Sequence, residues 1–444
     1  MNTPIYDFID QYRSKAPVRA HMPGHKGISA AECGFGEAYK YDITEIEGAD
    51  VLFEAKGIIA ESERNAASLF GTAGTFYSAA GSTLCIQAML ASVCGKDRAF
   101  ICARNSHKSV MNSCVLLGLE PCWIYPEYTS GSAVSGEITP EAVEKAIMQY
   151  SEKKPACVFI TSPDYLGRVA DIKGISEVCR KHGLPLLVDN AHGAYLAFLE
   201  ENIHPIHLGA DMCCDSAHKT LPVLTGGAYL HVKSEEYVSR IKQSMALFGS
   251  TSPSYLIMAS LDLCNKYLSE SFRTDLAKAA ERVKALKERL SPVWNIQDSE
   301  PMKLTVFALM AGLTGYQLAE QLRERGVEPE YADSAHVVLM FSASNTAEDL
   351  ERTAVVFESV KMPRIYLELP EIKISELQRA MLPGEAFFAD KERINVEDSV
   401  GRIAAESLSV CPPCVPVAVP GEIIDENAVK ILKMYSIFKI NVIK

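Results

Sequence analysis

The sequence predicts an α/β protein whose large domain is a mostly parallel, seven-stranded, doubly wound sheet, followed by a smaller α/β domain. Three observations support this fold class. Short β-rich segments alternate with helical patterns between residues 57 and 232, as is typical of parallel sheets. Several of these segments are apolar on both faces, as strands covered by helices on both sides should be. After residue 292, a second strand–helix–strand–helix pattern begins.

The expected strands of the large domain are 75–80, 99–103, 121–125, 156–161, 185–190, 211–215 and 228–232. Helices are expected between most of them, including 57–70, 82–94, 139–151 and 173–182. A long helix is expected over 253–291, before "SPVWN", whose Pro and Asn indicate a boundary. We therefore expect an N-terminal arm at 1–49, a large domain at 50–292 and a small α/β domain at 293–444.

Composition narrows the range of partners. Among 444 residues, 56 are acidic and 44 are basic, and the formal charge of −12 argues against a nucleic-acid partner. No apolar run is long enough to cross a bilayer, and the start of the chain lacks the pattern of a signal peptide. We expect a cytoplasmic protein without a membrane partner, whose 13 cysteines are mostly reduced and buried.

Polar clusters follow several of the expected strands. In open α/β sheets, ligands bind at the carboxyl ends of the strands. "AAGSTL" (79–84) also places hydroxyl groups where a strand passes into a helix, and a helix N-terminus attracts anions. The candidate residues at these strand ends are Ser82, Thr83, His107, Asp189, His192, Ser216, His218 and Lys219.

A lysine, a strand-end aspartate and an anion site together suit pyridoxal 5′-phosphate (PLP). The lysine amine forms a Schiff base with the PLP aldehyde, and an aspartate keeps the pyridine nitrogen protonated. A histidine can stack on the ring, and a small residue such as Ala191 can pack beneath it. Each residue alone also has an ordinary structural interpretation, as a cap, a turn or a surface charge. Their joint occurrence in this order favours a PLP site.

Two other motifs indicate metal or redox chemistry only weakly. Cys411 and Cys414 have C-x-x-C spacing, but they are flanked by prolines, and no second pair with zinc-site spacing follows. We expect a packed turn there, and the role of this cysteine pair stays open. His21 and His25 are separated by Pro23-Gly24, which prevents the helix that would direct both at one metal. We expect no metal site.

The chain resembles the Orn/Lys/Arg decarboxylase family, bacterial-type PLP enzymes with the aspartate-aminotransferase fold (fold type I). The resemblance rests on "HMPGHKG", "GSTLCIQAM", "RNSHKS", "VDNAHGAY", "DSAHKTL", "STSPSY" and "GRIAAESLSVCPPCVPVAVPGE". These motifs span nearly the whole chain, which is similar to the short members that lack an N-terminal wing domain. The resemblance implies decarboxylation of a basic amino acid for polyamine biosynthesis, in a homodimer with active sites at the subunit interface.

The resemblance also implies roles for individual residues. Lys219 would bind the cofactor aldehyde and Asp189 the pyridine nitrogen, and His107 would stack on the ring. Lys219 or His218 would return a proton to the substrate. The remaining cofactor-binding residues would be Ser82, Thr83, Ala191, His192, Ser216 and His218, together with Thr251, which would reach the cofactor of the neighbouring subunit.

The chain departs from the family pattern in two places. Asn190 stands where many members have Glu, and Cys411 and Cys414 stand where the family often has Tyr and Gly. Substrate preference is therefore less defined than cofactor binding: arginine is favoured, then lysine or ornithine. The alternatives are another fold-type-I reaction (aminotransferase or β-lyase) and a catalytically silent PLP-binding homologue. Candidates for binding a distal substrate cation are Glu330, Asp333 and Glu406.

Overall fold

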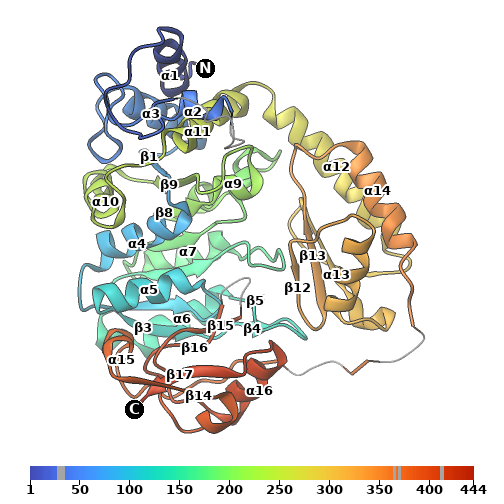
Figure 1. The fold of residues 1–444 in the computed structure, drawn as a ribbon. Coiled ribbons are helices and arrows are strands. Elements are labelled where there is room, and N and C mark those ends of the chain that lie inside the picture. Colours follow the sequence, from blue (N-terminus) through green and yellow to red (C-terminus); the bar gives the residue numbers. More distant parts are fainter. Residues whose placement is uncertain (28–35, 364–366, 369–371, 411–414) are drawn as a thin grey trace. The chain divides into compact units, whose positions relative to one another are not determined.

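The computed structural model describes every residue of the chain except 28–35, 364–366, 369–371 and 411–414. The Cys411–Cys414 pair therefore lies outside the described residues. The chain forms two compact units (Figure 1). Unit 1 comprises Met1–Ser92 and Leu187–Asp275, and unit 2 comprises Val93–Leu186 and Leu276–Lys444. Our division into arm, large domain and small domain remains a prediction.

Seven strands form the main sheet in the order β1-β9-β8-β7-β6-β2-β3. β7 pairs with β8 in parallel, as does β2 with both β3 and β6, whereas β9 is antiparallel to β1 and β8. The prediction of a mostly parallel, seven-stranded sheet is confirmed. The strands are β1 (Gly74–Ser78), β2 (Ala99–Ala103), β3 (Glu120–Ile124), β6 (Val158–Thr161), β7 (Leu186–Asp189), β8 (Met212–Asp215) and β9 (Ala228–Val232).

These strands form because their side chains are suited to burial on both faces of the sheet. Every residue of β1, β2, β7, β8 and β9 is buried. The expected strands 99–103 and 228–232 have the observed bounds, and the other five differ by only a few residues. Buried runs of this kind end where the first polar side chains of a loop begin, so their carboxyl ends position functional groups.

Helices alternate with the strands. In unit 1 they are α1 (Pro4–Ser14), α2 (Ala38–Tyr41), α3 (Ile58–Phe70), α4 (Gly81–Cys94), α8 (Pro205–Leu208), α9 (Ala217–Thr220), α10 (Glu235–Phe248) and α11 (Tyr255–Glu270). α4 and α12 (Phe272–Leu290) each extend across a unit boundary into unit 2. No helix among the described residues is both long enough and apolar enough to span a membrane.

The prediction of a single helix over 253–291 is wrong. Two helices, α11 and α12, meet at Ser271, whose backbone φ of −115° departs from helical geometry. The Ser271 hydroxyl donates to the Asp275 carboxylate (3.1 Å). Serine side chains compete in this way for polar partners near helix ends, which the apolar periodicity alone does not indicate.

Unit 2 contains a four-stranded antiparallel sheet of order β10-β11-β13-β12 and two-stranded sheets near the C-terminus. Its helices besides α12 are α5 (Lys108–Leu117), α6 (Pro140–Gln149), α7 (Ile172–Lys181), α13 (Gly315–Glu324), α14 (Ala347–Glu358), α15 (Pro383–Phe388) and α16 (Glu426–Met434). Its further strands are β4 (Glu127–Tyr128), β5 (Gly136–Glu137), β10 (Asn295–Gln297), β11 (Lys303–Phe307), β12 (Tyr331–Ala332), β13 (His336–Met340), β14 (Lys391–Asn395), β15 (Leu408–Val410), β16 (Val415–Ala418) and β17 (Lys439–Ile443). The expected alternation of strands and helices after residue 292 is confirmed.

A buried ion pair within unit 2 joins the end of β2 to the C-terminal segment. Arg104 donates to the carbonyl oxygens of Pro416 (2.8 Å) and Val417 (3.0 Å) and to the carboxylate of Glu422 (3.1 Å). Trp123 donates to the other Glu422 oxygen (3.1 Å), and its ring lies 4.7 Å from the Arg104 guanidinium carbon. The side chains of Arg104 and Glu422 are 0% and 1% exposed, so each charge depends on the other for its stabilisation.

Arg104→Met should lower the free energy of unfolding by about 3–5 kcal/mol, because it leaves the Glu422 carboxylate buried without its cation. Urea denaturation followed by the combined fluorescence of Trp123 and Trp294 measures this loss. Arg289→Met is the matched control, since Arg289 makes exposed ion pairs with Glu351 and Glu358, and surface pairs contribute little. Equal losses in the two variants would contradict the importance of the buried pair.

Candidate functional site

Lys219 lies in the short helix α9, directly after the carboxyl end of β8. Its Nζ donates to Nε2 of His192 (3.0 Å), and His192 follows the neighbouring strand β7. The His192 side chain is buried, and because its Nε2 accepts this hydrogen bond, that nitrogen carries no proton. The structure therefore holds the lysine amine at a defined position at the carboxyl edge of the sheet.

Asp189 is the last residue of β7 and is only 3% exposed. Its Oδ1 accepts hydrogen bonds from the Ala191 amide (3.2 Å) and from the Cys214 thiol (3.7 Å). Burial raises the pKa of Asp189, and the positive charge of Lys219 opposes that shift. Asp189 and Lys219 are thus electrostatically coupled within unit 1. A carboxyl with a raised pKa is suited to sharing a proton with a ligand.

The N-terminus of α4 begins in an open turn beside two hydroxyl groups. Gly81 has a φ of +70°, which favours glycine, and its amide donates to the Gly226 carbonyl (2.7 Å). No heavy atom lies within 4 Å of the position that a Cβ would occupy at Gly81, so the turn is open there. The Ser216 hydroxyl donates to that of Ser82 (2.8 Å), and Thr83 follows in the first helical turn. The hydroxyl groups of Ser82 and Ser216 therefore lie at the start of a helix, where the first backbone amides have no acceptor within the helix.

His218 is fixed by its own backbone and side chain together. Its amide (3.1 Å) and its Nδ1 (2.9 Å) both donate to the Gly227 carbonyl. This hydrogen bond places a proton on Nδ1. Gly226, with a φ of +98°, lets this loop approach β1 closely, because a Cβ there would lie 3.2 Å from the Ala79 carbonyl oxygen. The loop between α9 and β9 thus orients His218 and lies against the turn at Gly81.

The remaining predicted residues lie in three different settings. Ala191 is buried directly after Asn190. Thr251 lies in the exposed bend between α10 and α11 and makes none of the hydrogen bonds described above. His107 belongs to unit 2, where it caps α5, and its Nδ1 accepts from the Ser109 amide (3.2 Å). Within unit 1, Ser216 is thus hydrogen-bonded to Ser82 and Lys219 to His192. Asp189 interacts electrostatically with Lys219.

Residues 3–310 match the family described as Orn/Lys/Arg decarboxylase, major domain. Residues 362–441 match its counterpart, Orn/Lys/Arg decarboxylase, C-terminal domain. The chain belongs to the Orn/Lys/Arg decarboxylase family. The resemblance predicted from the sequence motifs is confirmed.

Curated relatives of this family member carry a more specific name. An arginine decarboxylase of Bacillus subtilis (strain 168) is 32% identical over 456 residues, covering 96% of this chain and 92% of the relative. An arginine decarboxylase of Halalkalibacterium halodurans is 33% identical over 457 residues, with coverage of 96% and 91%. Both relatives are matched over nearly their full length.

Solved structures confirm the fold class of this family member. The Escherichia coli constitutive lysine decarboxylase is similar with a TM-score of 0.81 at 18% identity, covering 100% of this chain and 82% of that one. A structure described as SPT with PLP has a TM-score of 0.55 at 15% identity, with coverage of 67% and 75%. These similarities support the predicted fold of type I PLP enzymes.

A buried polar cluster behind the strand ends was not predicted. Asp215, the last residue of β8, contacts His204, His231 and Asn190 through its carboxylate. The one signal in the sequence was a charged or polar residue inside otherwise apolar strands, such as His231 in "AYLHV". Neither residue spacing nor the family motifs indicated that these side chains meet.

The candidates for the distal substrate cation have other partners in unit 2. Asp333 is buried and accepts hydrogen bonds from the Tyr331 hydroxyl (3.0 Å) and the Ala335 amide (2.8 Å). Glu406 accepts from the side-chain amide of Asn441 (3.0 Å), and Glu330 accepts from the Tyr165 hydroxyl (2.8 Å). Asp333 thus accepts hydrogen bonds within its own turn, whereas Glu406 and Glu330 each accept one from a segment distant in the sequence.

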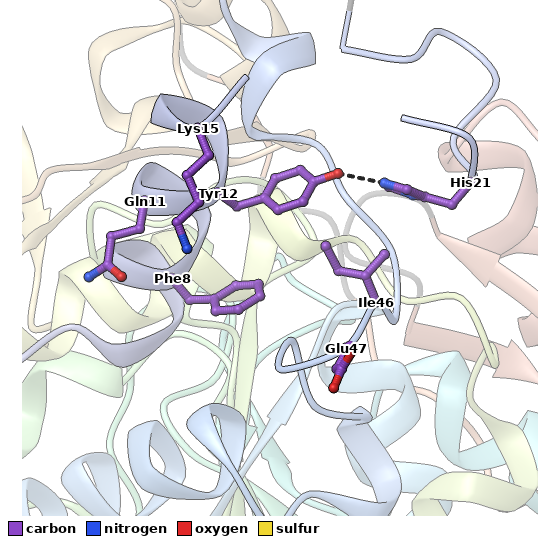
Figure 2. Close-up of a pocket in the computed structure, with 7 residues that line it drawn as sticks. All are labelled: Phe8, Gln11, Tyr12, Lys15, His21, Ile46 and Glu47. Carbon is purple, nitrogen blue, oxygen red and sulfur yellow. Dashed lines mark hydrogen bonds between the residues drawn. The ribbon is translucent and has the colours of Figure 1, made fainter. Parts of the chain in front are cut away.

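A separate pocket of about 300 Å³ lies beside α1 (Figure 2). In Figure 2 the Tyr12 hydroxyl and the His21 ring point toward each other, and they are hydrogen-bonded at 2.6 Å. His25 instead contacts Asp42 (3.1 Å), so the two histidines of "HMPGH" have different partners. None of the residues around Lys219 lines this pocket, whose lining comprises Phe8, Gln11, Tyr12, Lys15, His21, Ile46 and Glu47.

We expect inorganic phosphate to stabilise the cofactor-free protein by binding at the start of α4. Thermal unfolding in phosphate and in chloride of equal ionic strength measures this effect, which reaches about 2.7 kcal/mol at 100 times the dissociation constant. The Ser82→Ala/Ser216→Ala variant should lose most of it, whereas Ser269→Ala, on the exposed side of α11, should retain it. An equal gain in both variants would place the phosphate elsewhere.

Proposed function

We propose that this chain is a PLP-dependent decarboxylase of basic amino acids, with arginine as the favoured substrate and lysine or ornithine next. Family membership and near-full-length relatives named arginine decarboxylase support this proposal. The observation that carries it is the arrangement in unit 1, where the Lys219 amine is hydrogen-bonded to His192 (3.0 Å) and its charge acts on the buried carboxyl of Asp189.

The residues present suit PLP chemically. Lys219 would bind its aldehyde carbon, and Asp189 would hold a proton at its pyridine nitrogen. The open turn at Gly81, with the Ser82 and Ser216 hydroxyls in contact and Thr83 in the first turn of α4, would bind its phosphate. Ala191 and His192 would pack against the ring, and the family resemblance implies a stacking role for His107. When bound, PLP supplies a conjugated ring that takes up the electron pair left on Cα as CO₂ departs.

The protein's own residues would orient the substrate and move the proton. Lys219 or His218 would return a proton to Cα, which yields a primary amine. The Nδ1 of His218 is engaged with the Gly227 carbonyl, so its Nε2 is the nitrogen that would exchange the proton. Asp189 and His192 are themselves buried, so PLP bound against them would exclude water from that side. This exclusion favours the loss of the substrate's charged carboxylate.

The proposal extends to the oligomeric state and the cellular compartment. Thr251, exposed on this chain, would contact the cofactor of the partner in a homodimer. Ten described cysteines are buried free thiols, in keeping with a reducing cytoplasm. The amine product would enter polyamine biosynthesis. The two alternatives, an aminotransferase or β-lyase and a silent PLP-binding homologue, lack a specific observation in their favour.

Lys219→Ala should abolish the visible absorption of protein-bound PLP and reduce decarboxylation to background, because the cofactor loses its covalent attachment. The matched control is Lys108→Ala, since Lys108 also follows a His but is exposed at the start of α5. Absorbance spectra and chromatography of the amine product from arginine, lysine and ornithine are the measurements.

Wild-type protein should release CO₂ and one amine from arginine faster than from lysine or ornithine, without a keto-acid product. A keto acid would favour the aminotransferase alternative instead. Bound PLP with no turnover of any of the three amino acids would favour the silent homologue. Absence of a PLP band in supplemented wild-type protein would contradict the whole proposal.

A further inference from the structure

The carboxylate of Asp215 lies at the centre of a buried hydrogen-bond cluster in unit 1. Its Oδ1 accepts from the Asn190 side-chain amide (2.7 Å), and its Oδ2 accepts from Nε2 of His204 (3.0 Å) and Nε2 of His231 (3.0 Å). The side chains of Asp215 and His231 are 0% exposed, and that of His204 is 1% exposed. The ring of Phe70 covers both imidazoles, with centroid distances of 5.5 Å and 4.3 Å. The cluster is therefore shielded from water.

The hydrogen bonds of this cluster continue from His231 to two threonines. Nδ1 of His231 contacts the Thr75 hydroxyl (2.9 Å), which in turn contacts that of Thr72 (2.8 Å). Burial lowers the pKa of His231, which favours the neutral imidazole. A neutral ring that donates to Asp215 from Nε2 would accept from the Thr75 hydroxyl at Nδ1. Burial alone would raise the pKa of Asp215, but His204 and His231 outweigh it and hold that pKa below its usual range. Asp215 is thus a buried anion with a donor on each side.

Two histidines and an aspartate could also hold a metal ion. The geometry favours hydrogen bonding instead. Both Nε2 atoms lie at hydrogen-bond distance from Oδ2 of Asp215, and that of His204 also lies 3.3 Å from Oδ1. The third group in contact, the Asn190 amide nitrogen, is a donor that does not ligate metals. A carboxylate with these three donors is satisfied without an ion.

The cluster connects the two strand ends that carry the proposed catalytic groups. Asn190 directly follows Asp189, and the backbone amide of Asn190 donates to the Cys214 carbonyl (2.9 Å). Its side chain donates to Asp215, which directly precedes Ser216 and the helix of Lys219. One backbone and one side-chain hydrogen bond therefore fix the exit of β7 against the exit of β8. Histidines from β9 and from the segment before α8 hold the Asp215 carboxylate in place.

We propose that Asp215 is a positioning residue, which holds Asn190 and thereby fixes Asp189 relative to Ser216 and Lys219 for PLP binding. This role rests on the proposed function. It adds a group that does not touch the cofactor and acts through Asn190.

Asp215→Asn tests the role with almost no change of shape. Whichever way the new amide turns, its NH₂ faces a donor, either the Asn190 amide or the two imidazole N–H groups. Removing a hydrogen-bonded partner that orients a metal ligand typically lowers affinity or activity by about 10- to 100-fold. We expect Asp215→Asn to lower PLP affinity by a factor in that range. The dissociation constant comes from titration of the visible PLP band, and kcat should fall more than KM for arginine rises.

The swapped variant Asn190→Asp/Asp215→Asn should recover most of the lost PLP affinity. In it, the amide at 215 can donate to the new carboxylate at 190 while its oxygen accepts from both histidines. Asp262→Asn is the matched control for destabilisation alone, because Asp262 is an equally buried aspartate of unit 1 that accepts from the Ile5 and Tyr6 amides. It should lower the melting temperature but leave PLP affinity within about twofold of wild type.

Asp215→Asn with wild-type PLP affinity would overturn the positioning role while leaving the proposed function intact. A folded swapped variant without recovered affinity would also overturn it, and this variant decides if Asp215→Asn does not fold. One zinc ion per wild-type chain, lost in Asp215→Asn, would show a metal site instead. Wild-type protein that binds no PLP would overturn both proposals.

Discussion

The parallel register of β7 and β8 is the constraint on which the candidate site depends. Leu187 lies opposite Met212 and Asp189 opposite Cys214, so both strands deliver their polar ends to the same edge. Both faces of β7 and β8 are buried, and a shift by one residue would turn every side chain to the other face, where its packing partners differ. The packing of the sheet thus sets the separation of the Asp189 and Lys219 backbones, and the side chains refine it.

Around this edge, buried charge is stabilised locally. Asp189 is coupled to Lys219, and Asp215 is surrounded by three donors. Unit 2 follows the same principle, with Arg104 and Glu422 paired directly after β2. A buried charge without partners costs several kcal/mol, so these groups must form in a defined geometry.

The sequence predicted the strands and the residues at their ends because both are local properties. Apolar runs of suitable length define buried strands. Asp189 ends such a run, and Ser82 and Lys219 each lie in the helix that follows one. The sequence did not predict the contacts of His204 and His231 with Asp215, since three separate segments must first fold together. It also missed the break at Ser271, where one hydroxyl alters a continuous helical pattern. The roles of His107 and Thr251 depend on chain placements beyond unit 1 and stay predictions.

The central claim is that Lys219 binds PLP covalently, and mass spectrometry of the borohydride-reduced holoprotein tests it most directly. Reduction converts the lysine–cofactor linkage into a stable amine, and digestion then locates the attached group. We expect one pyridoxyl phosphate per chain, on the peptide that contains Lys219. Attachment at Lys108, or no retained cofactor after reduction, would contradict the account.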